Sequence, residues 1–156
     1  APLESPCVFW EIGWGGAEVE VDPETGEVTL LKLVVSGDAG KAIHPLVCQG
    51  QDEGAAMMGV SQALFETMKY DGTRLTNGTP LSYRVPLASD MPSEFWSITQ
   101  EQGHGPGPFG AKGMGEGGML PVASAVANAI EDAVGIRLTE LPLSPQRVLA
   151  AIKAKS

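Results

Sequence analysis

The sequence predicts an α+β fold in a single domain: an N-terminal β-hairpin, a long central helix, a glycine-rich loop leading into a helix, and a C-terminal helix. Three observations predict it. Apolar and acidic residues alternate around a D-P-E-T-G turn near the start, small and apolar residues recur at helical spacing in the middle, and a glycine-rich stretch runs directly into an Ala/Val-rich segment. A chain of 156 residues is long enough for one domain with its own core.

The hairpin is predicted from residues 17–36. Residues 17–21 read A-E-V-E-V, which places apolar side chains on one face of a strand and acids on the other. Residues 22–26 supply turn chemistry, and residues 27–36 are β-branched and mostly apolar, which is typical of a more buried strand. Residues 1–16 contain prolines and a W-G-G sequence, and we expect them to be irregular.

A long helix is predicted over residues 51–69. Met57, Val60, Leu64 and Met68 recur at helical spacing and would form its buried stripe. The residues before it, 37–45, contain two glycines and read as a loop. Farther along, residues 94–99 are aromatic and β-branched, which favours a short strand.

The last third of the chain predicts two more helices. Residues 120–134 carry an apolar face, Pro121 suits a first helical turn and Gly135 is a natural stop. Residues 137–143 resemble a strand, and Ser144 followed by proline is typical of the start of a final helix.

Charge and cysteine content exclude some classes of function. The net charge of −9 and the pI near 4.6 argue against nucleic-acid binding and against anionic membrane surfaces. No apolar run approaches the roughly 20 residues of a membrane span. Two cysteines without a C-x-x-C motif, and an N-terminal stretch without a signal-peptide pattern, lead us to expect a protein of the reducing cytoplasm.

The glycine loop, residues 110–118, reads G-A-K-G-M-G-E-G-G and carries one acid, Glu116. Three of its glycines satisfy G-x-G-x-x-G, but a dinucleotide site requires a buried strand directly before the first glycine, and the preceding residues read as a loop. Two interpretations remain from the residues alone. Glu116 either favours the dipole of the following helix, or faces a ligand that approaches the glycine backbone closely.

The other reactive side chains give weaker signals. His44 and His104 have no partner at metal-ligand spacing, so we expect no metal site built from protein side chains. Cys48 lies near the predicted helix start, where a thiol can become reactive, although a buried structural role is favoured.

The glycine loop and its Ala-rich helix resemble the G-x-K-G-x-G-E signature of the molybdenum hydroxylases, which include xanthine dehydrogenase, aldehyde oxidoreductase and the large subunit of aerobic carbon monoxide dehydrogenase. Three further stretches are similar to landmarks of that family in the same order. They read A-E-V-E-V-D-P-E-T-G-E-V, G-D-A-G-K-A-I-H-P and G-Q-D-E-G-A-A-M-M-G, and the ending L-P-L-S-P-Q-R-V-L-A-A-I is also similar. The resemblance covers nearly the whole chain from about Ala17.

The resemblance implies that the chain, residues 1–156, is the C-terminal part of the molybdopterin-binding region. It implies a molybdenum-dependent oxidoreductase that oxidises an aldehyde, N-heterocycle or similar small substrate with water as the oxygen source. Glu116 matches the family's general base. The resemblance also implies that Gln51, Lys112, Gly113, Met114 and Gly115 contact the cofactor, whose dithiolene holds the metal.

The chain departs from the family in two ways. Many relatives carry proline after the glutamate, whereas this chain has Gly117 and Gly118, as some carbon monoxide dehydrogenase-like members do. Family members also need several hundred more residues, iron–sulfur clusters and usually FAD. The resemblance therefore implies a fragment or split subunit, inactive alone, whose partners are the remainder of the molybdopterin subunit and iron–sulfur and flavin subunits.

The resemblance leaves the substrate, the electron acceptor and the nucleotide form of the cofactor open, although bacterial relatives commonly use the cytosine dinucleotide form. Two rival functions also remain at this point. One is a homologous but non-catalytic module for assembly or cofactor insertion, and the other is an unrelated α+β binding domain.

Overall fold

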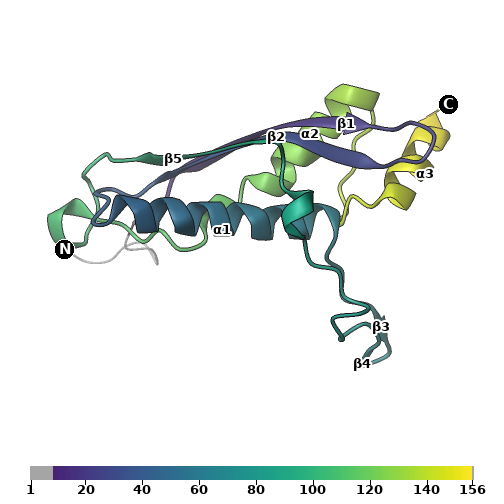
Figure 1. Ribbon diagram of the computed structural model, residues 1–156, viewed down its shortest axis with the longest axis horizontal. Helices are drawn as coiled ribbons and strands as arrows, with labels where there is room; N and C mark the ends of the chain where they lie inside the picture. Colours follow the sequence, from purple (N-terminus) through teal and green to yellow (C-terminus); the bar gives the residue numbers. More distant parts are fainter. Residues whose placement is uncertain (1–8, 156) are drawn as a thin grey trace.

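The computed structural model describes residues 9–155 and confirms the α+β class. A three-stranded sheet is covered on one face by two helices, and a third helix lies at one end, beside the turn of the hairpin (Figure 1). A two-stranded excursion extends away from this body.

The sheet has the order β1-β2-β5 and is built from β1 (Gly13–Val21), β2 (Val28–Asp38) and β5 (Glu94–Gln100). β1 and β2 are antiparallel, as the predicted hairpin requires, and β5 runs parallel to β2. The carboxylate of Asp22 shapes the turn by accepting hydrogen bonds from the backbone N–H of Glu24 and the hydroxyl of Thr25, each 2.8 Å long. The expectation that residues 13–16 are irregular is wrong, because they pair with the end of β2 and lengthen the hairpin.

The long helix α1 (Pro45–Leu64) begins six residues earlier than predicted. His44 caps it, since its Nδ1 accepts a hydrogen bond from the N–H of Val47 at 3.3 Å, and proline occupies the first turn. The helix also ends earlier, so Met68 is exposed beyond it, while Val60 and Leu64 are buried as expected.

α2 (Val122–Val134) and α3 (Pro145–Lys155) lie where the sequence predicts them. Gly135 ends α2 in the left-handed conformation, with φ 67°. The strand expected over residues 137–143 is absent from the part of the chain that the structure describes; this segment is irregular, and its Leu143 N–H donates to the carbonyl of Ala63 at 2.6 Å. It ties α3 to the end of α1 rather than to a sheet.

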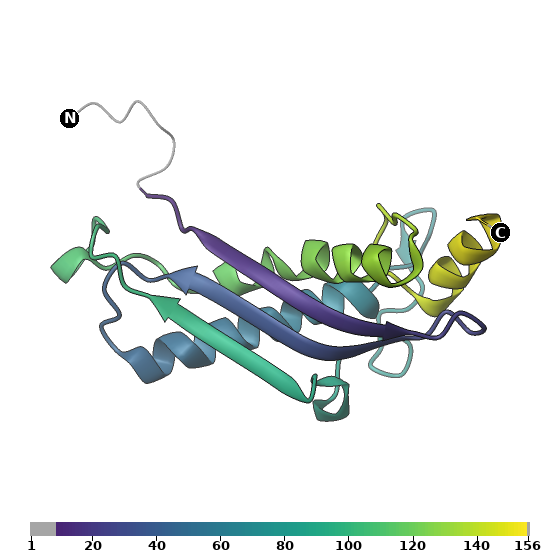
Figure 2. The same cartoon turned by 90° about the horizontal axis from the view of Figure 1, so that it is seen from above.

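The helices lie side by side under the sheet, α1 beneath β5 and β2 and α2 beneath β1 (Figure 2). The core between them is aliphatic and comprises, among others, Leu33, Val35, Val60, Val126 and Ile130. Burying side chains of this size contributes about 1.5–3 kcal/mol each. No helix within residues 9–155 combines the length and apolar character needed to cross a membrane.

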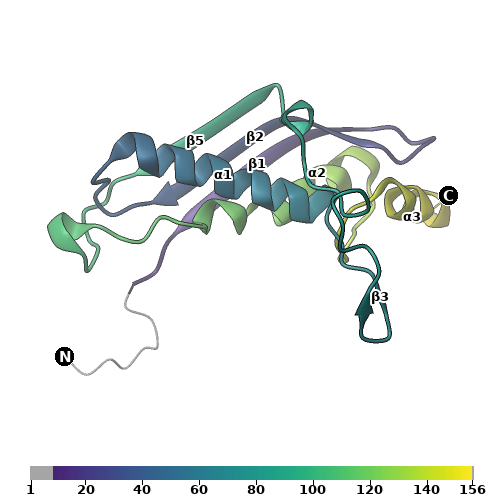
Figure 3. The same ribbon diagram turned by 60° about the horizontal axis from the view of Figure 1, so that its bottom comes forward.

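Short elements complete the chain. Residues 70–75 form the small hairpin of β3 (Tyr70–Asp71) and β4 (Arg74–Leu75), and three 3₁₀ turns follow at η1 (Ala88–Asp90), η2 (Pro108–Gly110) and η3 (Gly117–Met119). The last of these joins the glycine loop to α2 and packs against α1 (Figure 3). It carries the chain's glycine-rich stretch into the core of the molecule.

Candidate functional site: the glycine loop and the acids beneath it

The glycine loop is fixed to the loop that follows β2. The backbone N–H of Lys112 donates to the carbonyl of Ala39 at 2.9 Å, and a Cβ on Gly40 would collide with the carbonyl of Gly110. Gly40 itself has φ 63°, which favours glycine. Two segments about 70 residues apart in sequence are thereby held in direct backbone contact.

Lys112 turns its side chain into the protein. Its ammonium group donates to a carboxylate oxygen of Asp38 at 2.5 Å and to the carbonyl of Trp10 at 3.0 Å, and both side chains of the ion pair are more than 90% buried. Burial by itself would raise the pKa of Asp38, but hydrogen bonds from Lys112 and from the Gly40 N–H outweigh it and hold that pKa below its ordinary value. The pair fastens the loop to the end of β2.

Two further acids lie under the end of the loop. Asp52 on α1 is 2% exposed, and one of its oxygens accepts a hydrogen bond from the hydroxyl of Ser97 at 2.7 Å. Its other oxygen is buried, as is Oε1 of Glu11, and neither has a hydrogen-bond partner in the part of the chain that the structure describes. Glu11 lies just before β1, so the two acids come from different elements.

Glycines make the room for these two carboxyl groups. A Cβ on Gly117 would overlap Oε1 of Glu11, and a Cβ on Gly118 would overlap Oδ1 of Asp52. The Cβ position of Gly37 lies 3.6 Å from both of those oxygens. The glycine turn therefore rests directly on the two acids.

The acids are electrostatically unlike Asp38. Burial is the largest cause that raises the pKa of Glu11, followed by the nearby charges of Asp52 and Asp38, and Lys112 only partly offsets them. Burial likewise raises the pKa of Asp52 more than the Ser97 hydrogen bond lowers it. In both groups the neutral form is thus favoured more than it is for a carboxyl group in water.

Glu116, unlike Lys112 and the two acids beneath the loop, lies at the surface. It is exposed and precedes η3, and its carbonyl accepts the N–H of Met119 at 3.1 Å. Among residues 9–155, no hydrogen bond or ion pair is formed by its carboxylate. The loop therefore presents one free acid while its lysine is buried.

The remaining residues predicted to contact a cofactor divide into two groups. Gln51 is exposed on α1 directly before Asp52, and a Cβ on Gly115 would meet no atom of residues 9–155 within 4 Å. The Cβ position of Gly113 lies 3.1 Å from the ring of Phe9, and the methyl of Met114 lies 3.1 Å from the Cβ position of Gly37. Met114, like Lys112, therefore extends its side chain inward.

Other reactive side chains lie outside this arrangement. His44 is occupied as the cap of α1, His104 is exposed, and Cys48 is half-buried in α1, while Cys7 lies outside the described residues. Within residues 9–155, no three His, Cys, Asp or Glu side chains are arranged to hold a metal ion.

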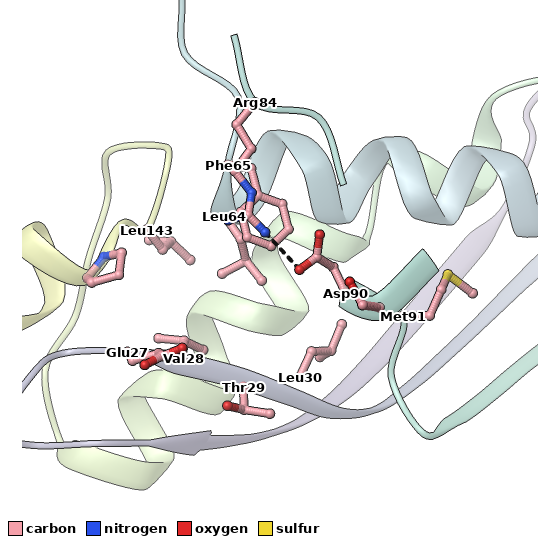
Figure 4. A pocket seen from close by; sticks show the side chains of 12 residues that line it. Glu27, Val28, Thr29, Leu30, Leu64, Phe65, Arg84, Asp90, Met91 and Leu143 are labelled. Atoms are coloured by element: carbon pink, nitrogen blue, oxygen red, sulfur yellow. Dashed lines mark hydrogen bonds and ion pairs between the residues drawn. The ribbon is translucent and has the colours of Figure 1, made fainter. Parts of the chain in front are cut away.

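A cavity of about 420 Å³ lies at the opposite end of α1, beside Leu64 and Phe65 (Figure 4). The guanidinium of Arg84 stacks over the ring of Phe65, 4.3 Å from its centroid, and pairs with Asp90 at 2.8 Å. Asp52 and Leu64 are separated by three turns of helix, about 18 Å along its axis. The cavity is therefore separate from the glycine loop and contains none of the predicted site residues.

Asp38, Glu11 and Asp52 were not among the predicted site residues. Helical spacing could have indicated that Asp52 is buried. Residues three and four apart lie on the same face of a helix, and Ala55 and Ala56, at that spacing from Asp52, are buried. No spacing rule connects Glu11 with Asp52, which the fold brings together from 41 residues apart.

Known proteins are similar to this chain in sequence and in fold. A family described as the molybdopterin cofactor-binding domain matches residues 3–92. The gamma subunit of the 6-hydroxypseudooxynicotine dehydrogenase complex of Paenarthrobacter nicotinovorans is 36% identical over 137 residues, covering 85% of this chain and 17% of that protein. The aldehyde oxidoreductase of Megalodesulfovibrio gigas is 34% identical over 155 residues, covering 97% of this chain and 16% of the relative.

Solved structures of two enzymes contain a similar fold over nearly the whole of this chain. The aldehyde oxidoreductase from Desulfovibrio desulfuricans superposes with a TM-score of 0.84 at 34% identity, over 94% of this chain and 16% of that one. Carbon monoxide dehydrogenase from Oligotropha carboxidovorans shares the fold with a TM-score of 0.82 at 20% identity, over 98% of this chain and 20% of that one. This chain spans about a sixth of the length of the curated relatives. It belongs to the molybdenum hydroxylase family, as a molybdopterin-binding part of the molybdenum-binding subunit.

Proposed function

We propose that this chain contributes the general base, Glu116, to a molybdenum hydroxylase that oxidises an aldehyde, N-heterocycle or similar small substrate with water as the oxygen source. The observation that carries the proposal is the contrast within one loop. Lys112 and Met114 are turned inward, whereas the carboxylate of Glu116 is exposed and has no partner among residues 9–155.

The residues of this face fit a large cofactor. Cβ positions on Gly50, Gly54 and Gly115 meet no atom of the described residues within 4 Å, so a cofactor would have room to approach the backbone on both α1 and the loop. Gln51 would bind it through its exposed amide, and Gly113 and Gly115 through their main chain. Because the ammonium of Lys112 is already paired with Asp38, Lys112 and Met114 would act by holding the loop in place.

When bound, the molybdenum cofactor supplies the oxygen-transfer and electron-accepting chemistry of the reaction. The task of Glu116 is to accept a proton beside it. A positioned base of this kind contributes typically 10²–10⁴-fold to the rate. The remainder of the subunit would exclude water from the site, and iron–sulfur and flavin partners would carry the electrons away.

The surface of the chain supports such a larger assembly. Ile43, Leu46 and Val47, at the start of α1, are 54–73% exposed, and Phe109 in the glycine-rich region is 86% exposed. Contiguous exposed apolar side chains usually mark a contact with another protein surface. We propose that the rest of the molybdenum-binding subunit covers them.

The test is Glu116→Gln in the complete enzyme, assayed together with its molybdenum content. We expect the rate to fall at least 100-fold at unchanged molybdenum content, with Glu20→Gln, an exposed acid on β1, as the control. A fall of less than ten-fold would contradict the general-base role. Loss of molybdenum at an unchanged rate per molybdenum would favour the alternative, a non-catalytic module for assembly or cofactor insertion.

A further inference from the structure

We propose that Glu11 and Asp52 share a single proton beneath the turn of Gly117 and Gly118, and that this proton-linked pair positions Glu116. The positioning role rests on the function proposed above for Glu116. The shared proton does not, because it follows from the contacts of the two acids themselves.

The fold places one oxygen of each acid close to the same glycine, Gly37. Oε1 of Glu11 and Oδ1 of Asp52 are both buried, have no hydrogen-bond partner among residues 9–155, and lie 3.6 Å from the Cβ position of Gly37. The second oxygen of Asp52 is already held by Ser97 at 2.7 Å, which fixes the direction of the free one. A cavity of about 220 Å³, lined in part by Gly117, adjoins Glu11.

Within residues 9–155, no unpaired cation lies beside the two acids to neutralise them. The charged or titratable groups that face it are Asp38 and Lys112 on the β2 side, and Glu53 next along α1. The ammonium of Lys112 is engaged by Asp38 and by the carbonyl of Trp10. Two ionised carboxylates would leave an uncompensated buried charge, whereas one proton converts their repulsion into a hydrogen bond.

The same contacts link the pair to Glu116. Gly117 and Gly118 follow Glu116 directly, and neither has room for a side chain above the acids. While the proton is present, the two carboxyl groups can lie close together and η3 can rest on them. Loss of the proton makes the two groups repel each other and displaces the turn that carries Glu116. The acids are therefore positioning residues.

Amide variants test the shared proton because each replaces the O–H with an N–H donor of the same shape. In difference infrared spectra of the complete subunit at pH 7, we expect one protonated carboxyl in the wild type, and we expect both Glu11→Gln and Asp52→Asn to remove it. Glu20→Gln, the matched surface control, should leave it unchanged. A proton that belongs to one acid would survive in one of the two variants and would overturn the sharing.

A wild type without a protonated carboxyl at pH 7 would also overturn the proposal. If the thermal stability of that protein then depended on added sodium or potassium ions, the two acids would instead form a cation site. Glu116→Gln should leave the infrared signal intact whatever its effect on the rate. Failure of the proposed function and failure of the shared proton are thus observed separately.

Amide hydrogen exchange tests the positioning without any assay of activity. The N–H of Met119, bonded to the carbonyl of Glu116, should lose protection in the wild type as the pH rises through the loss of the shared proton. Glu11→Gln should keep its protection over the same range, after correction for the intrinsic exchange rate. In Asp52→Leu, the N–H of Met119 should lack this protection at every pH. Equal behaviour of wild type and Glu11→Gln would contradict the positioning role.

Discussion

Lys112 and Asp38 form a buried ion pair that ties the glycine loop to the end of β2. The carboxylate also accepts the Gly40 N–H at 2.8 Å, so the pair holds the two segments that meet at this point. Because Glu116 follows Lys112 by four residues, the pair also limits how far the exposed acid can move.

Breaking this pair should be costly. Lys112→Ala leaves the Asp38 carboxylate buried without its cation, which typically costs about 3–5 kcal/mol. We expect a large drop in the thermal unfolding midpoint of the complete subunit and a lower molybdenum content. Lys41→Ala removes an exposed lysine paired with Glu101 and should change stability by about 1 kcal/mol or less. Equal effects of the two variants would show that burial of the Lys112 pair does not matter.

The acids in this layer should give opposite pH dependence. The pKa of Asp38 is lowered on folding, so its contribution is fully present above the unfolded value of about 3.9 and is lost as the pH falls through its folded value. The pKa values of Glu11 and Asp52 are raised, so these acids favour folding at low pH, and that contribution is lost as the pH rises above about 4.

Thermal unfolding of variants of the complete subunit distinguishes the stabilisation by Asp38 from the pH-dependent contribution of Glu11. Glu11→Gln should raise the midpoint at pH 7–8 relative to the wild type and should leave it nearly unchanged near pH 4. Asp38→Asn should lower the midpoint at pH 7, with a deficit that shrinks toward acid pH. A Glu11→Gln difference that does not vary with pH would contradict the raised pKa.

Much of the fold could be predicted from short sequence patterns, and the errors of that prediction also arise from short segments. Asp22 and Gly26 predicted the hairpin turn, and Gly135 predicted the end of α2. The predicted start of α1 was wrong because His44, which caps the helix, and the proline after it were assigned to a loop. A helix beginning at Gln51 makes Asp52 an ordinary first-turn acid, whereas a start at Pro45 places it on the buried face.

The candidate site was less accessible to prediction than the fold. The glycine stretch itself drew attention to Glu116, whereas its role as general base and the choice of Gln51 came from a family resemblance. Both residues are exposed, and their roles remain predictions. The acids beneath the loop depend on tertiary contacts between β1, α1 and η3, and no periodic pattern records such contacts. The inward direction of Lys112 is likewise decided by its distant partner Asp38.

The glycines of the turn should differ in their tolerance of a side chain. Gly118→Ala places a methyl group against Oδ1 and the carbonyl oxygen of Asp52, and overpacking of this kind typically costs about 1–3 kcal/mol. Gly115→Ala meets nothing within 4 Å and has no left-handed φ, so its stability should be nearly unchanged. Thermal unfolding of the complete subunit measures both effects. If Gly118→Ala is as stable as the wild type, the turn does not rest on the acid.

Gln51 offers a direct test of the cofactor face, because it is exposed and has no structural role on α1 among the described residues. Gln51→Ala should leave thermal stability unchanged and should lower the molybdenum content, or the rate per molybdenum, of the complete enzyme. Gln62→Ala is the matched control, since Gln62 is an exposed glutamine on the same helix, three turns farther along. A site on this face predicts that only the first variant is affected. Unchanged molybdenum content and rate in Gln51→Ala would exclude Gln51 from the cofactor contacts and would leave the glycine loop to bind the cofactor alone.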